Sequence, residues 1–301
     1  MMASSSQRPL AIFVHEGKTG SSTMRTVLRE LQRKNETDRW LCDFGSTNWT
    51  VSDVLAACNK ADIMIGGRHG LCTHFQRPCF YFTLMREPVA RLISAYNYFC
   101  LTCSDNGNYC RPDLTAGLFR GACPRMQFLE WATIHANQYT WHWSGRFAMR
   151  AEESGVNDAY FRGSLRGFVD RPPLTDADFA AATRTLAAPN MLVLRTEQLD
   201  ILGWDKLAAW LAGTRAARLL GIVARQRSAV GSANGTVVKF NNGSWVYTPT
   251  AAEKERVCVV NHFDCKLYGS VGVGLHPYHI DNSISIESIT PGGYCTCRYG
   301  T

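Results

Sequence analysis

Short apolar segments that alternate with helical patterns are the feature that most limits how this 301-residue chain can fold. Four segments are apolar without alternation, as in parallel strands buried on both faces. They are Leu10–Val14, Ile63–Ile65, Phe80–Met85 and Met191–Leu194. Apolar residues recur at helical spacing in 24–31, 89–96 and 207–211. Strands that alternate with helices predict an α/β fold with a parallel sheet and right-handed crossovers.

No repeat or long linker divides the sequence, so we expect a single domain over residues 1–301. Within it we distinguish a core with two anion-binding motifs at 8–99 and a Cys-rich insertion at 100–124. Further core and helices follow at 125–270, and a tail at 271–301.

The chain is basic: 32 Lys and Arg against 25 Asp and Glu give a formal charge of +7, which indicates an anionic partner. No block of five like charges occurs, so nucleic acid is not the expected partner. No apolar run approaches the roughly 18 residues of a membrane helix, and the N-terminus lacks the apolar part of a signal peptide. We expect a soluble chain, either complete or trimmed from an anchored protein.

Twelve Cys are many for a cytosolic enzyme. Local clusters favour disulfides and an oxidising compartment, with reduced thiols and a metal site as open alternatives. The clustered residues are Cys100, Cys103, Cys110 and Cys123, with Cys295 and Cys297 downstream of Cys258 and Cys265. Cys100-x-x-Cys103 has only half of a zinc spacing. Four N-x-[ST] sites point the same way, although chance produces a couple: Asn35, Asn48, Asn234 and Asn242.

The first motif, HEGKTGSST at 15–23, joins the first strand to an amphipathic helix. Gly17 and Gly20 permit a tight turn and a close approach of the backbone to a ligand. The N–H groups at the helix start favour a phosphate, and Lys18 adds a positive charge. Hydroxyl donors complete the predicted anion site: Thr19, Ser21, Ser22 and Thr23.

This motif is not a complete Walker A loop. Gly17-Lys18-Thr19 fits the end of G-x-x-x-x-G-K-[ST], but the first Gly of that pattern falls at Ile12, inside the strand. No later strand that we predict ends in an acidic residue suited to Mg²⁺. An ordinary capped helix remains an alternative, but it leaves Lys18 and the hydroxyl cluster unexplained.

The second motif, REPVARLISAY at 86–96, follows the strand Phe80–Met85. Arg86 lies at the carboxyl end of that strand, where open parallel sheets bind ligands, and Pro88 suits a helix start. Ser94 lies about two turns into the helix. Arg86 and Ser94 therefore form a second phosphate site, unless Arg86 only pairs with a carboxylate.

Together the two motifs resemble the sulfotransferases that use 3′-phosphoadenosine 5′-phosphosulfate (PAPS). HEGKTGSST resembles the 5′-phosphosulfate loop of that family, and REPVARLISAY its 3′-phosphate motif, R-[DE]-P-x-x-R-x-x-S-x-Y. The nearest group is the Golgi carbohydrate type, such as the heparan sulfate 2-O- and 6-O-sulfotransferases. Two weaker matches are Leu194–Glu197 and the N-x-x-D-x-x-L-Y pattern at Asn261–Tyr268.

The resemblance implies a P-loop NTPase-like three-layer sandwich with a central parallel sheet. It also implies in-line transfer of a sulfuryl group from PAPS, with adenosine 3′,5′-bisphosphate as product and no metal. Two separate phosphate sites match a nucleotide with phosphates at both 3′ and 5′. Lys18 and the N–H groups of residues 20–23 would stabilise the charge that builds on the departing phosphate oxygen.

The acceptor hydroxyl needs a general base, and His titrates in the right range. In the resembling family this base is a His in the region that corresponds to 66–75. His69 is favoured over His74 because it follows a strand end, and His15 and Glu16 beside the first motif remain alternatives.

The resemblance implies an acceptor that is a glycan or another hydroxylated molecule, in the Golgi lumen or secretory pathway; a cytoplasmic location is the alternative. Trp141 and Trp143 lie in a stretch similar to the family's N-Q-x-T pattern and are expected to stack on the acceptor or to lie in the core. Arg227 and Lys239 are expected donor or acceptor contacts in a closing loop.

Three rival functions remain: the same chemistry on a small molecule or tyrosine, a P-loop kinase or NTPase, and a silent glycan-binding module. The missing first Gly argues against the kinase, and the retention of Lys18, Arg86 and Ser94 gives no sign of lost activity.

Overall fold

A computed structural model gives the fold of the chain in two compact units. One comprises 1–85 and 190–238, the other 86–189 and 239–301, and each is described by itself. The predicted single domain stays a prediction. The structure describes residues 9–17, 19–34, 40–43, 51–67, 69–98, 127–146, 173–199, 204–212, 216–218, 220 and 247–271.

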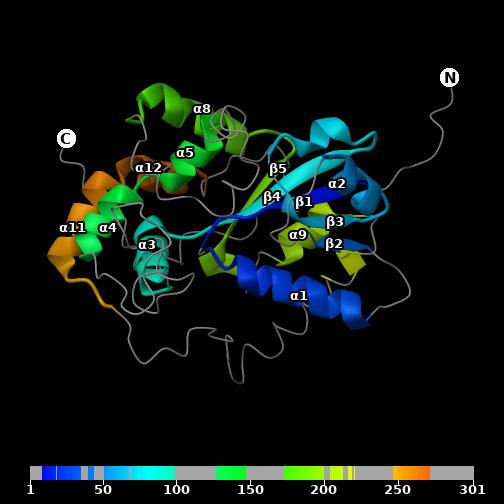
Figure 1. The fold of residues 1–301 in the computed structure, drawn as a ribbon, viewed down its shortest axis with the longest axis horizontal. Coiled ribbons are helices and arrows are strands. Elements are labelled where there is room, and N and C mark those ends of the chain that lie inside the picture. Colours follow the sequence, from blue (N-terminus) through cyan, green and yellow to red (C-terminus); the bar gives the residue numbers. More distant parts are fainter. Residues whose placement is uncertain are drawn as a thin grey trace, which may run out of the picture. The chain divides into compact units, whose positions relative to one another are not determined.

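A five-stranded, all-parallel sheet in the order β2-β3-β1-β4-β5 forms the first unit (Figure 1). The strands are β1 (Leu10–Val14), β2 (Leu41–Asp43), β3 (Ile63–Gly67), β4 (Cys79–Met85) and β5 (Met191–Arg195). The predicted α/β fold with a central parallel sheet is confirmed, as are the four strands predicted from apolar runs. The sequence missed β2, because this three-residue edge strand is only half-buried and pairs with β3 alone.

One face of the sheet packs against α1 and α9. Phe13 and Phe82 stack with ring centroids 5.0 Å apart, and they share a core with Met24 and Leu28 of α1 and Trp204 of α9. Both helices follow the apolar spacing seen in the sequence. The helices of this unit are α1 (Ser21–Lys34), α2 (Val51–Cys58) and α9 (Trp204–Trp210), with 3₁₀ turns η1 (Leu71–His74) and η4 (Thr196–Gln198).

The edge strand β2, which the sequence did not predict, ends in the acidic residue Asp43. The carboxylate forms ion pairs with Arg25 and Arg29 of α1. These two cations neutralise Asp43, and β2 lies at the edge of the sheet, away from β1. Asp43 therefore serves to hold α1 against the sheet edge.

Two disulfides join described residues of the first unit. Cys42–Cys58 joins β2 to α2, and Cys72–Cys79 joins η1 to the start of β4. They fit a secreted or lumenal protein, as predicted from the Cys content, because such bonds persist in oxidising compartments.

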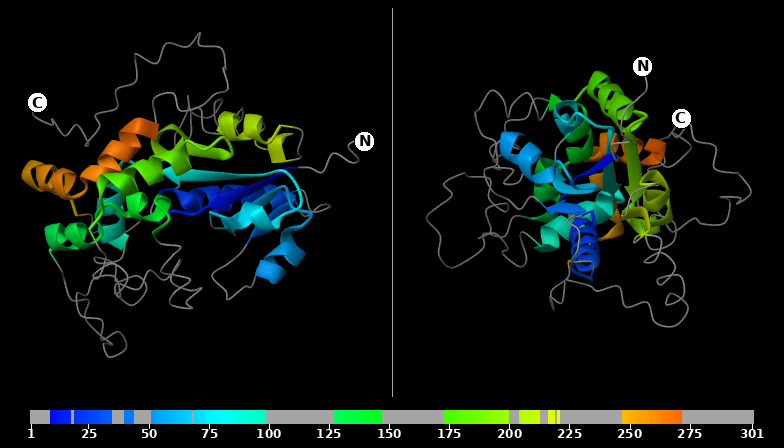
Figure 2. Two further views of the ribbon diagram at one scale, coloured as in Figure 1. Left: turned by 90° about the horizontal axis from the view of Figure 1, so that it is seen from above. Right: turned by 90° about the vertical axis from the view of Figure 1, so that its right-hand side faces the viewer.

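The second unit is helical in the part that the structure describes. Figure 2 shows α12 lying along α5 and α8, with which it makes contact. Its elements are α3 (Pro88–Tyr96), α4 (Phe128–Ile134), α5 (Gln138–Trp143), α8 (Asp176–Leu186), α11 (Ala251–Val260) and α12 (His262–Val271). Among the described helices of both units, none has the length and apolarity to cross a bilayer.

Candidate functional site

The carboxyl ends of four parallel strands meet at one edge of the sheet. Val14 of β1 pairs with Gly67 of β3 and with Thr83 of β4, and Met85 pairs with Arg195 of β5. Both sequence motifs start at this edge, because one follows β1 and the other follows β4. Open parallel sheets bind ligands at such an edge.

The loop after β1 is held by its own hydroxyls. Thr19 Oγ1 and Ser21 Oγ each donate to the carbonyl oxygen of Glu16, at 2.9 Å in both cases. Gly20 adopts φ +90°, which a residue with a side chain rarely does. Two of the predicted hydroxyl donors therefore shape the loop, whereas Ser22 at the start of α1 is exposed.

One hydroxyl joins this loop to the end of β4. Thr196 of η4 donates a shared hydrogen bond to the carbonyl oxygens of Thr19 and Met85. Its methyl group lies 3.1 Å from where a Cβ on Gly20 would stand, so a side chain at this position would require Thr196 to shift. The loop of the first motif is thereby fixed beside the residue that precedes the second motif.

The second motif begins at Arg86, which directly follows β4. The Arg86 residue is half-buried. Glu87 is the N-cap of α3, where its carboxylate accepts from the N–H groups of Val89 and Ala90. Because Glu87 occupies the helix start, the positive end of α3 is already neutralised. Ser94, the other predicted anion-binding residue of this motif, is also half-buried.

The side-chain hydroxyl of Tyr139, in α5, contacts both backbone polar groups of Arg86. The N–H of Arg86 donates to the Tyr139 hydroxyl at 3.0 Å, and that hydroxyl lies 3.2 Å from the Arg86 carbonyl oxygen, to which it donates. The Tyr139 side chain is completely buried. The guanidinium of Arg91 lies over its ring, 4.8 Å from the centroid.

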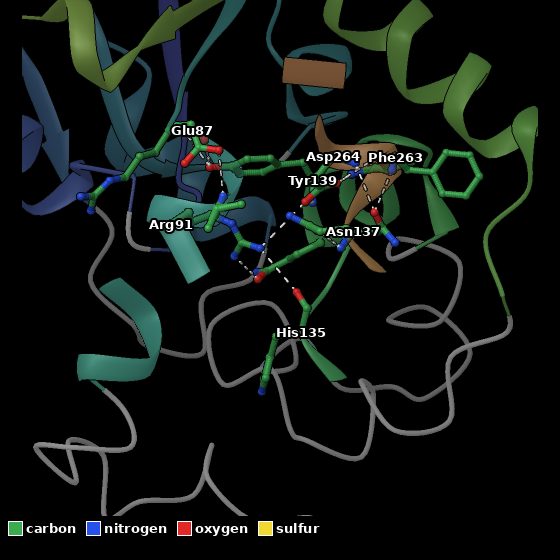
Figure 3. Close-up of polar contacts among 12 residues, drawn as sticks. Glu87, Arg91, His135, Asn137, Tyr139, Phe263 and Asp264 are labelled. Carbon is green, nitrogen blue, oxygen red and sulfur yellow. Dashed lines mark hydrogen bonds and ion pairs between the residues drawn. The ribbon is translucent and has the colours of Figure 1, made fainter. Parts of the chain in front are cut away.

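The starts of α5 and α12 cap one another (Figure 3). Asp264 of α12 accepts from the N–H groups of Tyr139 and Thr140 and from the Thr140 hydroxyl. In return, the side-chain oxygen of Asn137 accepts from the N–H groups of Phe263 and Asp264. Asn137 has φ 56°, a left-handed conformation that Asn tolerates better than most residues.

A buried charge pair lies beside these caps. Arg91 of α3 and Asp264 are 2% and 0% exposed, and their closest charged atoms are 3.9 Å apart. Arg91 also donates to the side chain of Gln138 at 2.6 Å and to the carbonyl of His135 at 3.4 Å. Burial raises the pKa of Asp264, while Arg91 and the donors of Tyr139 and Thr140 oppose that rise.

The candidate bases lie between β3 and β4. His69 and His74 are both exposed, and the His69 ring lies 4.9 Å from the ring of Tyr81. The Tyr81 hydroxyl accepts from the N–H of Cys72 at 2.7 Å, and burial raises the pKa of this phenol. Together with the Cys72–Cys79 disulfide, this contact fixes the segment that carries both histidines to β4.

Of the alternative bases, His15 is half-buried and Glu16 is 2% exposed. For Trp141 and Trp143 the sequence left two alternatives, stacking on the acceptor or a place in the core, and these side chains are only 5% and 1% exposed. The second of the two readings, a place in the core, is the one observed.

Several predicted residues lie outside the described residues: Lys18, Arg227, Lys239, the four sequons and Cys100, Cys103, Cys110, Cys123, Cys295 and Cys297. Within the described ranges, no group of three or more His, Cys, Asp or Glu could hold a metal ion.

Residues 8–153 match the model of the sulfotransferase family. This part of the chain is similar to sulfotransferases. The match covers 146 of the 301 residues and contains both motifs, and the P-loop-like fold of that family agrees with the parallel sheet observed. A search of curated proteins found no match. The match supports transfer of a sulfuryl group to a hydroxylated acceptor, and such enzymes typically take the group from PAPS.

Sequence reasoning missed the residues that support the two motifs. Thr196, Asn137, Tyr139 and Asp264 all lie in the weaker family-like stretches, but those stretches carried no indication of what they contact. The sequence signal that could have found them is a polar residue within an otherwise apolar helical segment. Such a residue is expected to be buried and therefore to need a hydrogen-bond partner.

Proposed function

We propose that this chain transfers the sulfuryl group of PAPS to an acceptor hydroxyl. One observation carries the proposal beyond the family match: the Thr196 hydroxyl binds both the loop of the first motif and the end of β4. Each motif follows the carboxyl end of a strand of this sheet, and two anion-binding motifs suit a ligand with two separated phosphates.

The first motif is proposed to bind the 5′-phosphosulfate. Backbone N–H groups at the start of the 14-residue α1 and the Lys18 ammonium favour the negative charge. In the transfer, the bond from sulfur to the acceptor oxygen forms as the bond from sulfur to the phosphate oxygen breaks. Charge develops on that departing oxygen, where Lys18 and the N–H groups stabilise it.

The second motif is proposed to bind the 3′-phosphate. The Arg86 guanidinium presents a fork of donors, and the Ser94 hydroxyl adds another. Occupation of the α3 start by Glu87 supports this division of roles, because the helix end itself is then unavailable to the phosphate. Arg227 is proposed as a further donor contact.

His69 or His74 is proposed to accept the proton of the acceptor hydroxyl. Both imidazoles are exposed, so a glycan hydroxyl can reach them. Their segment is attached to β4 by the Cys72–Cys79 disulfide, which suits a base that must keep its position. His→Asn replacement at the true base lowers kcat and leaves donor affinity near the wild-type value.

The proposed acceptor is a carbohydrate in the Golgi lumen. The two disulfides and the net charge of +7 support a lumenal enzyme that meets acidic glycans. A small molecule or tyrosine is the alternative acceptor. Product formation from labelled PAPS over a panel of glycans, phenols and tyrosine peptides distinguishes them, and transfer to none of these favours a silent glycan-binding module.

The donor is tested by thermal shift with adenosine 3′,5′-bisphosphate and, separately, with ATP and Mg²⁺. A bisphosphate that binds raises Tm, because ligands of the folded state stabilise it. Stabilisation by ATP and Mg²⁺ alone contradicts the proposal and favours the kinase. Lys18→Ala abolishes transfer with Tm unchanged, and a fully active variant refutes the role of Lys18.

A further inference from the structure

The backbone of Arg86 is held by a group that neither motif contains. The Tyr139 hydroxyl lies 3.0 Å from the Arg86 nitrogen and 3.2 Å from its carbonyl oxygen. A hydroxyl can accept from one group while donating to another, so this one uses both capacities on a single residue. The peptide planes on both sides of Arg86 are thereby fixed, and with them the direction in which its side chain leaves the backbone.

Tyr139 is itself held from two sides within the second unit. Its N–H donates to Asp264 Oδ2 at 3.0 Å, and the Arg91 guanidinium covers its ring. All three side chains are at most 2% exposed. Close packing leaves the tyrosine ring little freedom, so the position of its hydroxyl is set before any ligand arrives.

Arg86 needs such support because of where it lies. It is between the end of β4 and the start of α3, so neither strand pairing nor helical hydrogen bonds fix both of its backbone groups. A long side chain on an unfixed backbone loses more conformational entropy when it grips a phosphate.

We infer that Tyr139 is a positioning residue for the 3′-phosphate of the donor and acts through Arg86. This inference rests on the proposed function, in which Arg86 binds that phosphate. The hydroxyl does not touch the nucleotide. It holds Arg86 ready to bind, so its removal weakens recognition of the 3′-phosphate and leaves the remainder of the nucleotide unaffected.

The test compares two nucleotides that differ only by the 3′-phosphate, adenosine 3′,5′-bisphosphate and adenosine 5′-monophosphate, by calorimetry on the full chain. The ratio of their Kd values measures recognition of the 3′-phosphate. We expect Tyr139→Phe to reduce this ratio about tenfold, the size of effect expected for one or two neutral hydrogen bonds. The KM for PAPS rises while the KM for the acceptor stays unchanged.

Thr140→Val is the matched control. Thr140 is the next residue of α5 and is also fully buried. The substitution removes a hydroxyl that donates to Asp264 at 3.0 Å and has no contact with Arg86. This variant should keep the wild-type ratio even where its Tm falls. An equal loss of the ratio in Thr140→Val, or an equal weakening of both nucleotides in Tyr139→Phe, shows a merely structural role and overturns the inference.

A double variant tests whether the effect passes through Arg86. Once Arg86→Ala has removed the guanidinium, adding Tyr139→Phe should not change the ratio of the Kd values further. The effects of two substitutions that act on the same interaction are not additive. A full additional tenfold loss overturns the inference. A wild-type protein that binds both nucleotides equally contradicts the proposed function itself, whereas a wild-type preference that Tyr139→Phe leaves intact contradicts only the positioning role.

Amide hydrogen exchange on the wild-type protein covers the case in which Tyr139→Phe does not fold. The Arg86 N–H should exchange slowly, because Tyr139 accepts its hydrogen bond. Exchange at the rate of an open loop overturns the inference.

Discussion

The two proposed phosphate-binding segments are held in different ways. The loop between β1 and α1 is shaped by neutral hydrogen bonds to its own carbonyls and by a left-handed glycine, with Thr196 as the distant contact. The junction between β4 and α3 depends on a buried network that includes Arg91 and Asp264, 173 residues apart in the sequence.

The two segments are therefore sensitive to different losses of contact. A neutral hydrogen bond contributes about 1 kcal/mol, so the loop can lose one contact and persist. A buried charge that loses its partner costs about 3–5 kcal/mol, so the junction fails when one member of its network is removed.

Replacement of Asp264 by Ala should have the largest effect, a loss of about 3–5 kcal/mol in the free energy of unfolding. It leaves Arg91 buried without its carboxylate and the donors of Tyr139 and Thr140 without their acceptor. Urea unfolding measures the loss. Asp264→Asn keeps one acceptor oxygen and should lose less. A loss below about 1 kcal/mol in Asp264→Ala would show that the network is not what holds the junction.

Removal of the Cys42–Cys58 disulfide tests the covalent support of the first unit. The double Ser variant should lose about 3 kcal/mol, because the bond closes a loop with a sequence separation of 16. Loss of Cys72–Cys79, with a separation of 7, should cost about 0.6 kcal/mol less. Urea unfolding under oxidising conditions compares the two variants, and equal stability of the wild type with and without reductant would contradict both values.

Gly20→Ala tests how strongly the left-handed turn constrains the loop between β1 and α1. A side chain at φ +90° and a Cβ 3.1 Å from Thr196 should together cost about 1–2 kcal/mol of stability. Gly17→Ala is the matched control in the same loop, since a Cβ there meets nothing within 4 Å. Thermal unfolding should separate the two variants. Equal Tm values would show that the left-handed turn does not constrain the loop.

The smallest expected effect is a pH dependence at the start of α8. Asp178 forms a capping box with Thr175 and an ion pair with Arg146 at 2.6 Å. Burial raises the pKa of Asp178, but the hydrogen bonds of Thr175 and the charge of Arg146 outweigh this, so the net shift is downward. Asp178→Asn should therefore lose about 1 kcal/mol at neutral pH.

The lowered pKa of Asp178 determines how its contribution to the free energy of unfolding changes with pH. The stabilisation by Asp178 is present above its unfolded pKa, near 3.9, and is lost as pH falls through the folded value. The difference in stability between wild type and Asp178→Asn should accordingly shrink below about pH 4. A difference that grows on acidification would contradict this sign.

Much of the first unit could be predicted from the sequence, because most of its strands are marked by an apolar run within their own residues. Apolar runs located β1, β3, β4 and β5. In the second unit, Pro88 begins α3 as predicted. The short edge strand β2 was missed because it carries no such run and stays half-buried.

The supports of the second motif could not be predicted in the same way. Asn137 and Asp264 are ordinary polar residues in sequence, and their role arises only when two helix starts meet across 127 positions. Only burial decides between the two alternatives left open for Trp141 and Trp143, since no periodicity shows which aromatic side chain faces a ligand and which faces the core. The assignments of Lys18, Arg86, Ser94 and the histidines to donor and base remain predictions.

The reciprocal caps of α5 and α12 have a consequence for synthesis of the chain. Every residue of the five-stranded sheet has been made once residue 195 is added, whereas α5 lacks its cap until Asp264 leaves the ribosome. A nascent chain that stops at residue 250 thus contains the whole sheet but has Tyr139 without the carboxylate that anchors it. Arg86 then gains its full support only when α12 has been translated.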